Sequence, residues 1–169
     1  MNTIAKPRSL TCIILSVIIV FSCVSLSASA PDIIPPSPTK HQQTMEQFLG
    51  DIRSIHAQLF DIAQFSLEDP GLTLDELANA IAFINYDIER LYNDTTEYLK
   101  LFPSISVENT QVLLAITALN FIKNELYYLS LVIPAISDIE RLQILNQYFR
   151  ARLSAVDTLE LLEEDLANY

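Results

Sequence analysis

The stretch LDELANAIAFINYDIERLYNDTTEY, residues 74 to 98, decides the fold class. It places residues suited to a core at alternating steps of three and four: Leu74, Leu77, Ile81, Ile84, Ile88, Leu91, Thr95 and Tyr98. This spacing gathers them on one stripe of an α-helix, whereas a strand would need strict alternation. Thr73 and Glu76 form a capping-box pattern before the stretch. We therefore predict one long helix here, about 29 residues and roughly 43 Å in length.

Three further segments repeat the helical spacing. The first runs from residue 41 and carries Met45, Phe48, Ile52, Ile55, Leu59 and Ile62. Another runs from Ser106 to Ile133, after the break FPSIS, with an expected core stripe of Val112, Ala115, Leu119, Ile122, Leu126, Leu129 and Ile133. The last runs from Asp138 to about Ala167, with an expected core stripe of Ile139, Leu142, Leu145, Phe149, Leu153, Val156 and Leu159.

Short connections between helices of similar length place neighbours antiparallel. Residues 41–169 are therefore predicted to form an all-α, up-down-up-down antiparallel four-helix bundle. The alternative is a helix that continues through Pro134, which would give three longer rods. Ser137 with Glu140 repeats the capping-box pattern after this proline and favours a new helix start.

Residues 1–30 have the pattern of an export signal. Lys6 and Arg8 precede an apolar run over residues 9–26 whose only polar types are Ser and Thr. Val20-Phe21-Ser22-Cys23 resembles the bacterial lipoprotein signal, which implies lipidation of Cys23. A cut near Ala28 or Ala30 would instead release a secreted protein, and an uncleaved anchor is a third possibility. Residues 31–40 hold four prolines and are predicted to form an extended spacer.

The compartment follows from cysteine usage and the leader. Both cysteines, Cys12 and Cys23, lie within the apolar run, so no disulfide can form in the folded part. This favours a bacterial envelope protein, lipid-anchored or secreted. In the lipoprotein interpretation, Val24 stands where an aspartate would favour inner-membrane retention, which points to the outer membrane.

Charge excludes one class of partner. Lys6 and Arg8 belong to the leader, which leaves eight basic against 21 acidic residues and a net charge of −13. Phosphate backbones are bound by Lys and Arg, so nucleic acid is not an expected partner. Contact with a membrane is expected only through the N-terminal lipid or anchor. A protein partner with a basic surface would suit this charge better.

No pattern of residues in the chain specifies a reaction. The two histidines, His41 and His56, lack the Glu-x-x-His spacing of di-iron bundles, and His56 is expected to be half-exposed on its helix. No glycine-rich phosphate loop or nucleophile elbow occurs. We therefore predict no metal or cofactor and lean toward a non-catalytic protein. A hydrolase that uses carboxylates from facing helices stays open as an alternative.

The helix at 106–133 has more apolar surface than one stripe requires. Leu114, Phe121 and Tyr128 lie outside its expected core stripe, and Phe83 and Tyr86 lie outside the stripe of the preceding helix. Either the helix is set deeply in the bundle, or these residues contact a partner. We predict a partner-binding protein whose partner is another envelope protein or a second copy of the chain. A carrier or sensor of an apolar ligand is the alternative. Asn93 begins a glycosylation sequon, Asn-Asp-Thr.

Overall fold

The computed structural model describes residues 35–68, 74–132, 134–135 and 137–169 of the 169-residue chain. Its helices are α2 (Pro38–Glu68), α3 (Leu74–Leu99), α4 (Val107–Val132) and α5 (Asp138–Ala167). The predicted export signal, with its lipidation candidate Cys23, lies outside the described residues and stays a prediction.

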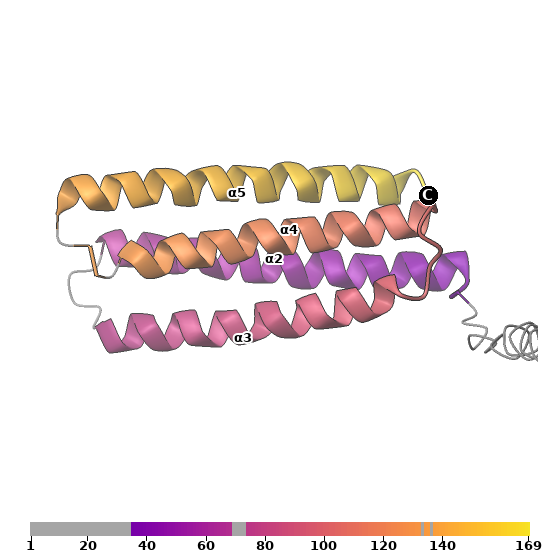
Figure 1. Ribbon diagram of the computed structural model, residues 1–169, viewed down its shortest axis with the longest axis horizontal. Coiled ribbons are helices and arrows are strands. Elements are labelled where there is room, and N and C mark those ends of the chain that lie inside the picture. Colours follow the sequence, from indigo (N-terminus) through magenta and orange to yellow (C-terminus); the bar gives the residue numbers. More distant parts are fainter. Residues whose placement is uncertain (1–34, 69–73, 133, 136) are drawn as a thin grey trace, which may run out of the picture. The chain divides into compact units, whose positions relative to one another are not determined.

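The four described helices pack together lengthwise. Consecutive helices run in opposite directions, and α4 lies between α3 and α5 (Figure 1). This confirms the predicted all-α class and the antiparallel packing of four helices. Residues 35–169 form one compact unit.

The start of α2 differs slightly from the predicted boundary. The helix begins at Pro38, within the range predicted as spacer. The Ser37 carbonyl oxygen accepts the N–H of His41 at 2.8 Å, and the Ser37 hydroxyl accepts the N–H of Lys40 at 3.4 Å. Proline fits the first turn because the N–H it lacks would have no intrahelical partner there.

The connection between α4 and α5 settles whether the chain is helical through Pro134. Ser137 has an extended backbone, with φ −127° and ψ 153°, and its hydroxyl accepts the N–H of Glu140 at 3.2 Å. Ser137 is thus the N-cap of a new helix. The predicted separation into two helices is confirmed, and the three-rod alternative is wrong.

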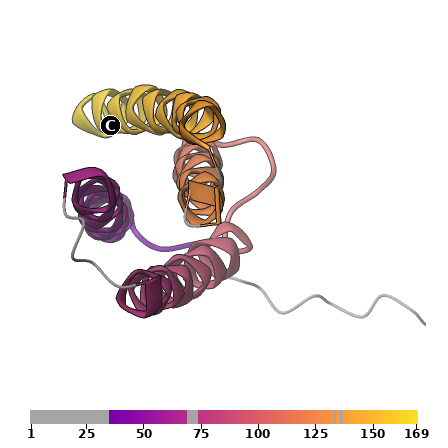
Figure 2. The same cartoon turned by 90° about the vertical axis from the view of Figure 1, so that its left-hand side faces the viewer.

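The helix α4 makes the most extensive contacts of the four described helices. Both α4 and α2 pack against the three other helices, whereas α3 and α5 lie on opposite sides of the bundle and do not contact each other (Figure 2). A helix that packs so extensively must be apolar around much of its circumference. This packing accounts for much of the surplus apolar surface that the sequence shows over residues 106–133.

The predicted core stripes of α2, α3 and α4 are confirmed in their main positions. The fully or nearly fully buried members are Met45, Ile52, Ile55 and Leu59 on α2, Leu77, Ile84, Ile88, Leu91 and Thr95 on α3, and Val112, Ala115, Leu119, Ile122, Leu126 and Leu129 on α4. The one buried hydroxyl among them, on Thr95, donates to the Leu91 carbonyl oxygen at 2.6 Å. The buried Thr95 therefore adds no unsatisfied hydroxyl group to the core.

The predicted core stripe of α5 is largely wrong. Of its members only Leu145 and Leu159 are buried. The side that faces the bundle instead carries Leu145, Tyr148, Ala151, Ala155, Thr158, Leu159, Leu162 and Leu166. Two of these residues are alanines, whose short side chains allow the backbone of α5 to lie close to its neighbour. The larger residues that the spacing had assigned to the core lie in solvent.

Candidate functional site

The exposed apolar side of α5 is the first candidate site. Ile139 is 71% exposed, Leu142 67%, Phe149 44% and Leu153 63%. These four residues, here called the α5 stripe, recur at steps of three, seven and four and share one side of the helix. An unpartnered row of large apolar side chains on one helix is typical of a contact surface.

The surroundings of the α5 stripe are poor in carboxylates. Asp138 and Glu140 flank Ile139 at its start, but residues 141–156 contain no carboxylate, and the exposed neighbours Gln143, Asn146 and Arg150 are neutral or basic. The exposed side of the C-terminal half of α5 carries Asp157, Glu160, Glu163 and Glu164. In a chain of net charge −11, the stripe from Leu142 to Leu153 is thus a region where a partner meets little negative charge.

The predicted contact residues on α4 lie deeper than the α5 stripe. Leu114, Phe121 and Tyr128 are half-buried and pack against the core. Phe121 and Tyr128 also line a shallow pocket of about 210 Å³ together with residues of α5, among them Arg150 and Ala151. Two of the three predicted residues thus reach a groove between α4 and α5, where their remaining exposed surface lies.

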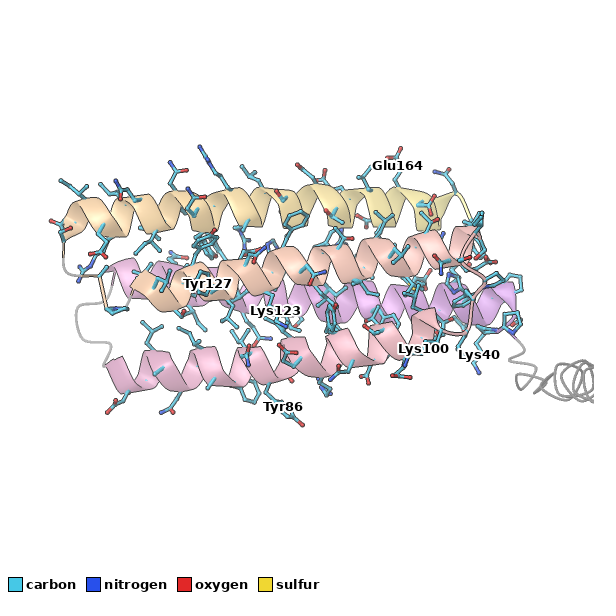
Figure 3. All side chains as sticks on the ribbon, viewed as in Figure 1. Lys40, Tyr86, Lys100, Lys123, Tyr127 and Glu164 are labelled. Atoms are coloured by element: carbon cyan, nitrogen blue, oxygen red, sulfur yellow. The ribbon has the colours of Figure 1, made fainter. Side chains whose placement is uncertain are left out.

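The predicted contact residues on α3 form a separate patch. Phe83 and Tyr86 are 63% and 66% exposed, and Tyr86 points away from the bundle (Figure 3). Phe83 lines a pocket of about 240 Å³ with Ile62 of α2. Because α3 and α5 lie on opposite sides of the bundle, this pair is not continuous with the α5 stripe.

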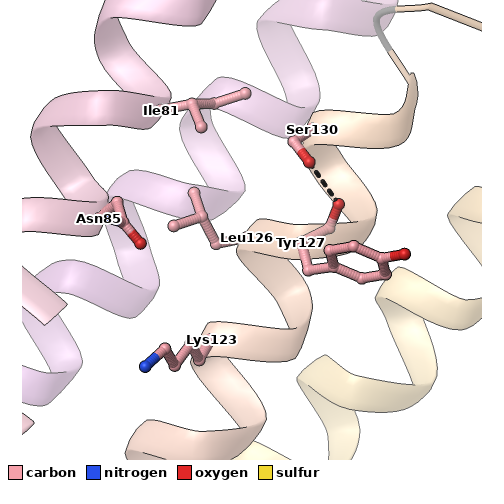
Figure 4. Close-up of a pocket in the computed structure, with 6 residues that line it drawn as sticks. All are labelled: Ile81, Asn85, Lys123, Leu126, Tyr127 and Ser130. Carbon is pink, nitrogen blue, oxygen red and sulfur yellow. Dashed lines mark hydrogen bonds between the residues drawn. The ribbon is translucent and has the colours of Figure 1, made fainter. Parts of the chain in front are cut away.

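A further pocket, of about 300 Å³, lies between α3 and α4 (Figure 4). Ile81 of α3 and Leu126 of α4 supply its apolar wall, and Tyr127 and Lys123 lie at its α4 side. The Ser130 hydroxyl donates to the Tyr127 carbonyl oxygen at 2.7 Å, so its hydrogen is directed into the helix. The pocket is at the lower end of the volumes that hold small ligands.

A second candidate site is a buried charged cluster that joins three helices. Glu125 of α4 is fully buried, and its Oε1 lies 3.1 Å from Nε2 of His56 on α2. Its Oε2 lies 3.6 Å from Nη1 of Arg152 on α5. Arg152 also donates to the His56 carbonyl oxygen at 3.1 Å and places its guanidinium 4.5 Å from the centre of the Phe60 ring. We call His56, Glu125 and Arg152 the buried triad.

The two contacts of His56 Nε2 exclude each other chemically. The same nitrogen lies 3.1 Å from Glu125 and 3.2 Å from Nη1 of Arg152. With a proton on Nε2 it can donate to the carboxylate, and without one it can accept from the guanidinium. Neither oxygen of Glu125 accepts a hydrogen bond of good geometry. The proton on His56 therefore determines which member of the triad this histidine bonds.

Burial dominates the ionisation of the triad's carboxyl group. Desolvation raises the pKa of Glu125 above its ordinary value, and the contacts with His56 and Arg152 offset this in part. The neighbouring Tyr148 is affected in the same direction. Burial, and then the charge of Glu125, raise the pKa of Tyr148 to about 12. The site is thus a charged pair held in a poorly solvated position.

The other histidine belongs to a separate buried cluster at one end of the bundle. Nε2 of His41 lies 2.8 Å from Oε1 of Gln111, and Nδ1 lies 3.1 Å from the Tyr98 hydroxyl. The amide oxygen can only accept, so Nε2 carries a proton. The rings of Phe102 and Tyr169 pack edge-on against His41 at 5.0 and 5.5 Å. These contacts tie the start of α2 to the end of α3, to the start of α4 and to Tyr169 after α5, which is a structural role.

Neither cluster resembles a metal or hydrolytic site. Within the described ranges, no three His, Cys, Asp or Glu residues come together in a way that could hold a metal ion. The polar partners of the buried Glu125 are a histidine and an arginine rather than a second carboxylate.

None of the helices that the structure describes is both long and apolar enough to cross a membrane. No known protein family matches the chain, and no curated protein or solved structure matches it either.

Sequence reasoning missed both candidate sites for identifiable reasons. It expected His56 to be half-exposed, which is wrong, since His56 is only 7% exposed. The available signal was Glu125, the one acidic residue within the apolar segment 112–133, which demands a partner if that helix is buried. It found the residues of the α5 stripe but assigned them to the core.

Proposed function

We propose that the chain is an exported, membrane-tethered helical-bundle protein without catalytic activity that acts by binding another protein. The basic and apolar leader supports export, and the Cys23 pattern supports the tether. The expected partner is another protein of the cell envelope, with a second copy of the chain as the alternative. The observation that carries the proposal is the α5 stripe.

The stripe suits a contact surface better than a solvated surface. When a partner covers four large apolar side chains, the free energy falls by roughly 25 cal/mol per Å² of apolar surface removed from water. Residues 141–156 contain no carboxylate, so a partner that covers Leu142, Phe149 and Leu153 desolvates little negative charge. An amphipathic helix of the partner, laid along the stripe, would match its length and its helical spacing.

Two leucine substitutions on the same helix test the proposal. Leu153→Glu lies in the stripe, and Leu161→Glu is the matched control, because Leu161 is 56% exposed in the acidic half of α5. Neither change should disturb folding, since both side chains already contact water. Only Leu153→Glu should abolish capture of a partner, because an interface would have to desolvate the new charge.

The measurement is affinity capture of the full-length tagged chain from crosslinked envelope extracts, with the captured proteins identified by mass. Loss of one protein with Leu153→Glu and its retention with Leu161→Glu is the expected result. If the captured protein is the chain itself, the partner is a second copy. Equal capture by both variants would contradict the proposal.

The pocket between α3 and α4 favours a second candidate function, that of a carrier or sensor of an apolar ligand. Its wall of Ile81 and Leu126 is apolar, and its volume of about 300 Å³ suits a small molecule. Native mass spectrometry of protein purified from its source would show a bound mass in that case. A consistently unliganded mass would remove this candidate.

A further inference from the structure

The helix α5 has two apolar sides, and the less bulky one faces the bundle. Over residues 139–155 the inward side carries Leu145, Tyr148, Ala151 and Ala155, while the outward side is the α5 stripe. Tyr148 and Leu153 are five residues apart and thus lie roughly 140° apart around the helix axis. Over this half of the helix, burial of apolar surface alone would favour turning the stripe inward. The C-terminal half of α5 favours the described orientation, because Leu159, Leu162 and Leu166 are buried on the same side as Tyr148.

The buried triad favours the orientation of α5 in which the stripe faces solvent. Arg152 lies on the inward side, where it donates to the His56 carbonyl oxygen at 3.1 Å and lies 3.6 Å from Glu125. A rotation that brought the stripe inward would carry Arg152 away. The fully buried Glu125 would then face leucine and phenylalanine side chains without its guanidinium partner. Glu125 would keep only His56 of α2 as a partner, and loss of the guanidinium beside a buried carboxylate is strongly unfavourable.

We propose that the triad of His56, Glu125 and Arg152 selects the side of α5 that packs against the bundle and thereby keeps the stripe in solvent. The triad acts as a register device, a known use of polar groups in helical cores. Together with the buried Leu159, Leu162 and Leu166, it offsets the hydrophobic preference of residues 139–155 for the other orientation. The inference concerns the orientation of α5 and stands whether or not the stripe binds a partner.

Two cysteine reporters measure this orientation. The starting protein is the full chain with Cys12 and Cys23 replaced by Ser, which leaves no native thiol. Leu153→Cys places a thiol on the exposed side, and Ala155→Cys places one on the fully buried side. The measured quantity is the ratio of their labelling rates with a thiol reagent under native conditions. This ratio is high when the triad holds α5 in the described orientation.

Removal of the guanidinium should lower that ratio. In the Arg152→Met background we expect a fall of about tenfold, as a minor orientation of α5 becomes well populated. Arg150→Met is the matched control, since Arg150 is an exposed arginine two residues earlier on the same helix. It should leave the ratio unchanged. An unchanged ratio in Arg152→Met, with helical content retained, would overturn the proposal.

A double variant keeps the test decisive if Arg152→Met fails to fold. Replacing Glu125 by Leu and Arg152 by Ala removes both charges and adds no large apolar side chain to the inward side of α5, so the bundle should fold. The ratio should again fall, because the triad then no longer opposes the apolar preference of residues 139–155. A ratio equal to that of the starting protein would show that packing alone sets the orientation.

Discussion

Burial of Glu125 is unfavourable for the stability of the bundle, but we infer that it helps to select one packing arrangement of α5. Its carboxyl group is buried at the meeting point of α2, α4 and α5, and its two oxygens lie 3.1 Å from His56 Nε2 and 3.6 Å from Arg152 Nη1. Desolvation of a charge at such a site costs several kcal/mol, which an ion pair recovers only in part. The residue is therefore better explained by what it selects than by the stability it contributes.

The pH dependence of stability should reveal this cost. Because burial raises the pKa of Glu125, the folded protein binds this proton more tightly than the unfolded chain. The stabilisation that this proton gives the folded state is fully present below the ordinary pKa of 4.5. It is lost as the pH rises through the raised pKa of the folded protein. Relative to Glu125→Gln, the wild-type free energy of unfolding should rise as the pH falls from neutral toward 4.5.

Urea denaturation of both proteins over a series of pH values measures this difference. The variant removes the titrating carboxyl group and keeps its size, so other carboxylates cancel in the comparison. Curves that stay parallel, or a wild type that weakens relative to the variant, would contradict the account of Glu125.

At the scale of the element, α3 and α5 differ in how far their sequences determine their packing. On α3 a single three-four spacing of Ile and Leu exists, so the stripe containing Ile84 and Ile88 could be predicted and is buried. On α5 two such spacings overlap and share Leu145 and Leu159. Hydrophobic periodicity does not distinguish the two spacings, and the larger side chains of the exposed spacing led to its prediction as the core. The deciding residue is Arg152, whose partners lie on other helices and leave no local signal in the sequence.

The same distinction predicts the response of two leucines that the sequence pattern treats alike. Leu159→Ala should destabilise the bundle by about 2–5 kcal/mol, because Leu159 is buried and the change leaves a cavity. Leu153→Ala should cost less than about 0.5 kcal/mol, since its side chain is exposed. Chemical denaturation of the two variants checks both values. Equal losses, or a larger loss at Leu153, would mean that α5 packs through the other side.

For the whole molecule, the position of α4 resolves most of the surplus apolar surface in the sequence. With α2, α3 and α5 around it, α4 buries residues on three sides, and its predicted contact residues Phe121 and Tyr128 are half-buried against α5. The apolar surface that no element covers lies elsewhere, chiefly on the outward side of α5. The four helices and their order could be predicted from local patterns. Which helix makes the most extensive contacts could not be predicted, because that depends on how all four helices pack at once.

The α5 stripe as a partner-contact surface is the central claim, and photocrosslinking from single positions tests it most directly. A photoreactive amino acid is placed at Leu142 in the stripe, at Leu161 in the acidic half of α5, or at Tyr86 on α3, all of them exposed. The chain is expressed in its own source and irradiated in intact cells. We expect one protein, crosslinked in high yield, from Leu142 and little from the other two. No adduct from Leu142, or an equal adduct from Tyr86 or Leu161, would contradict the claim.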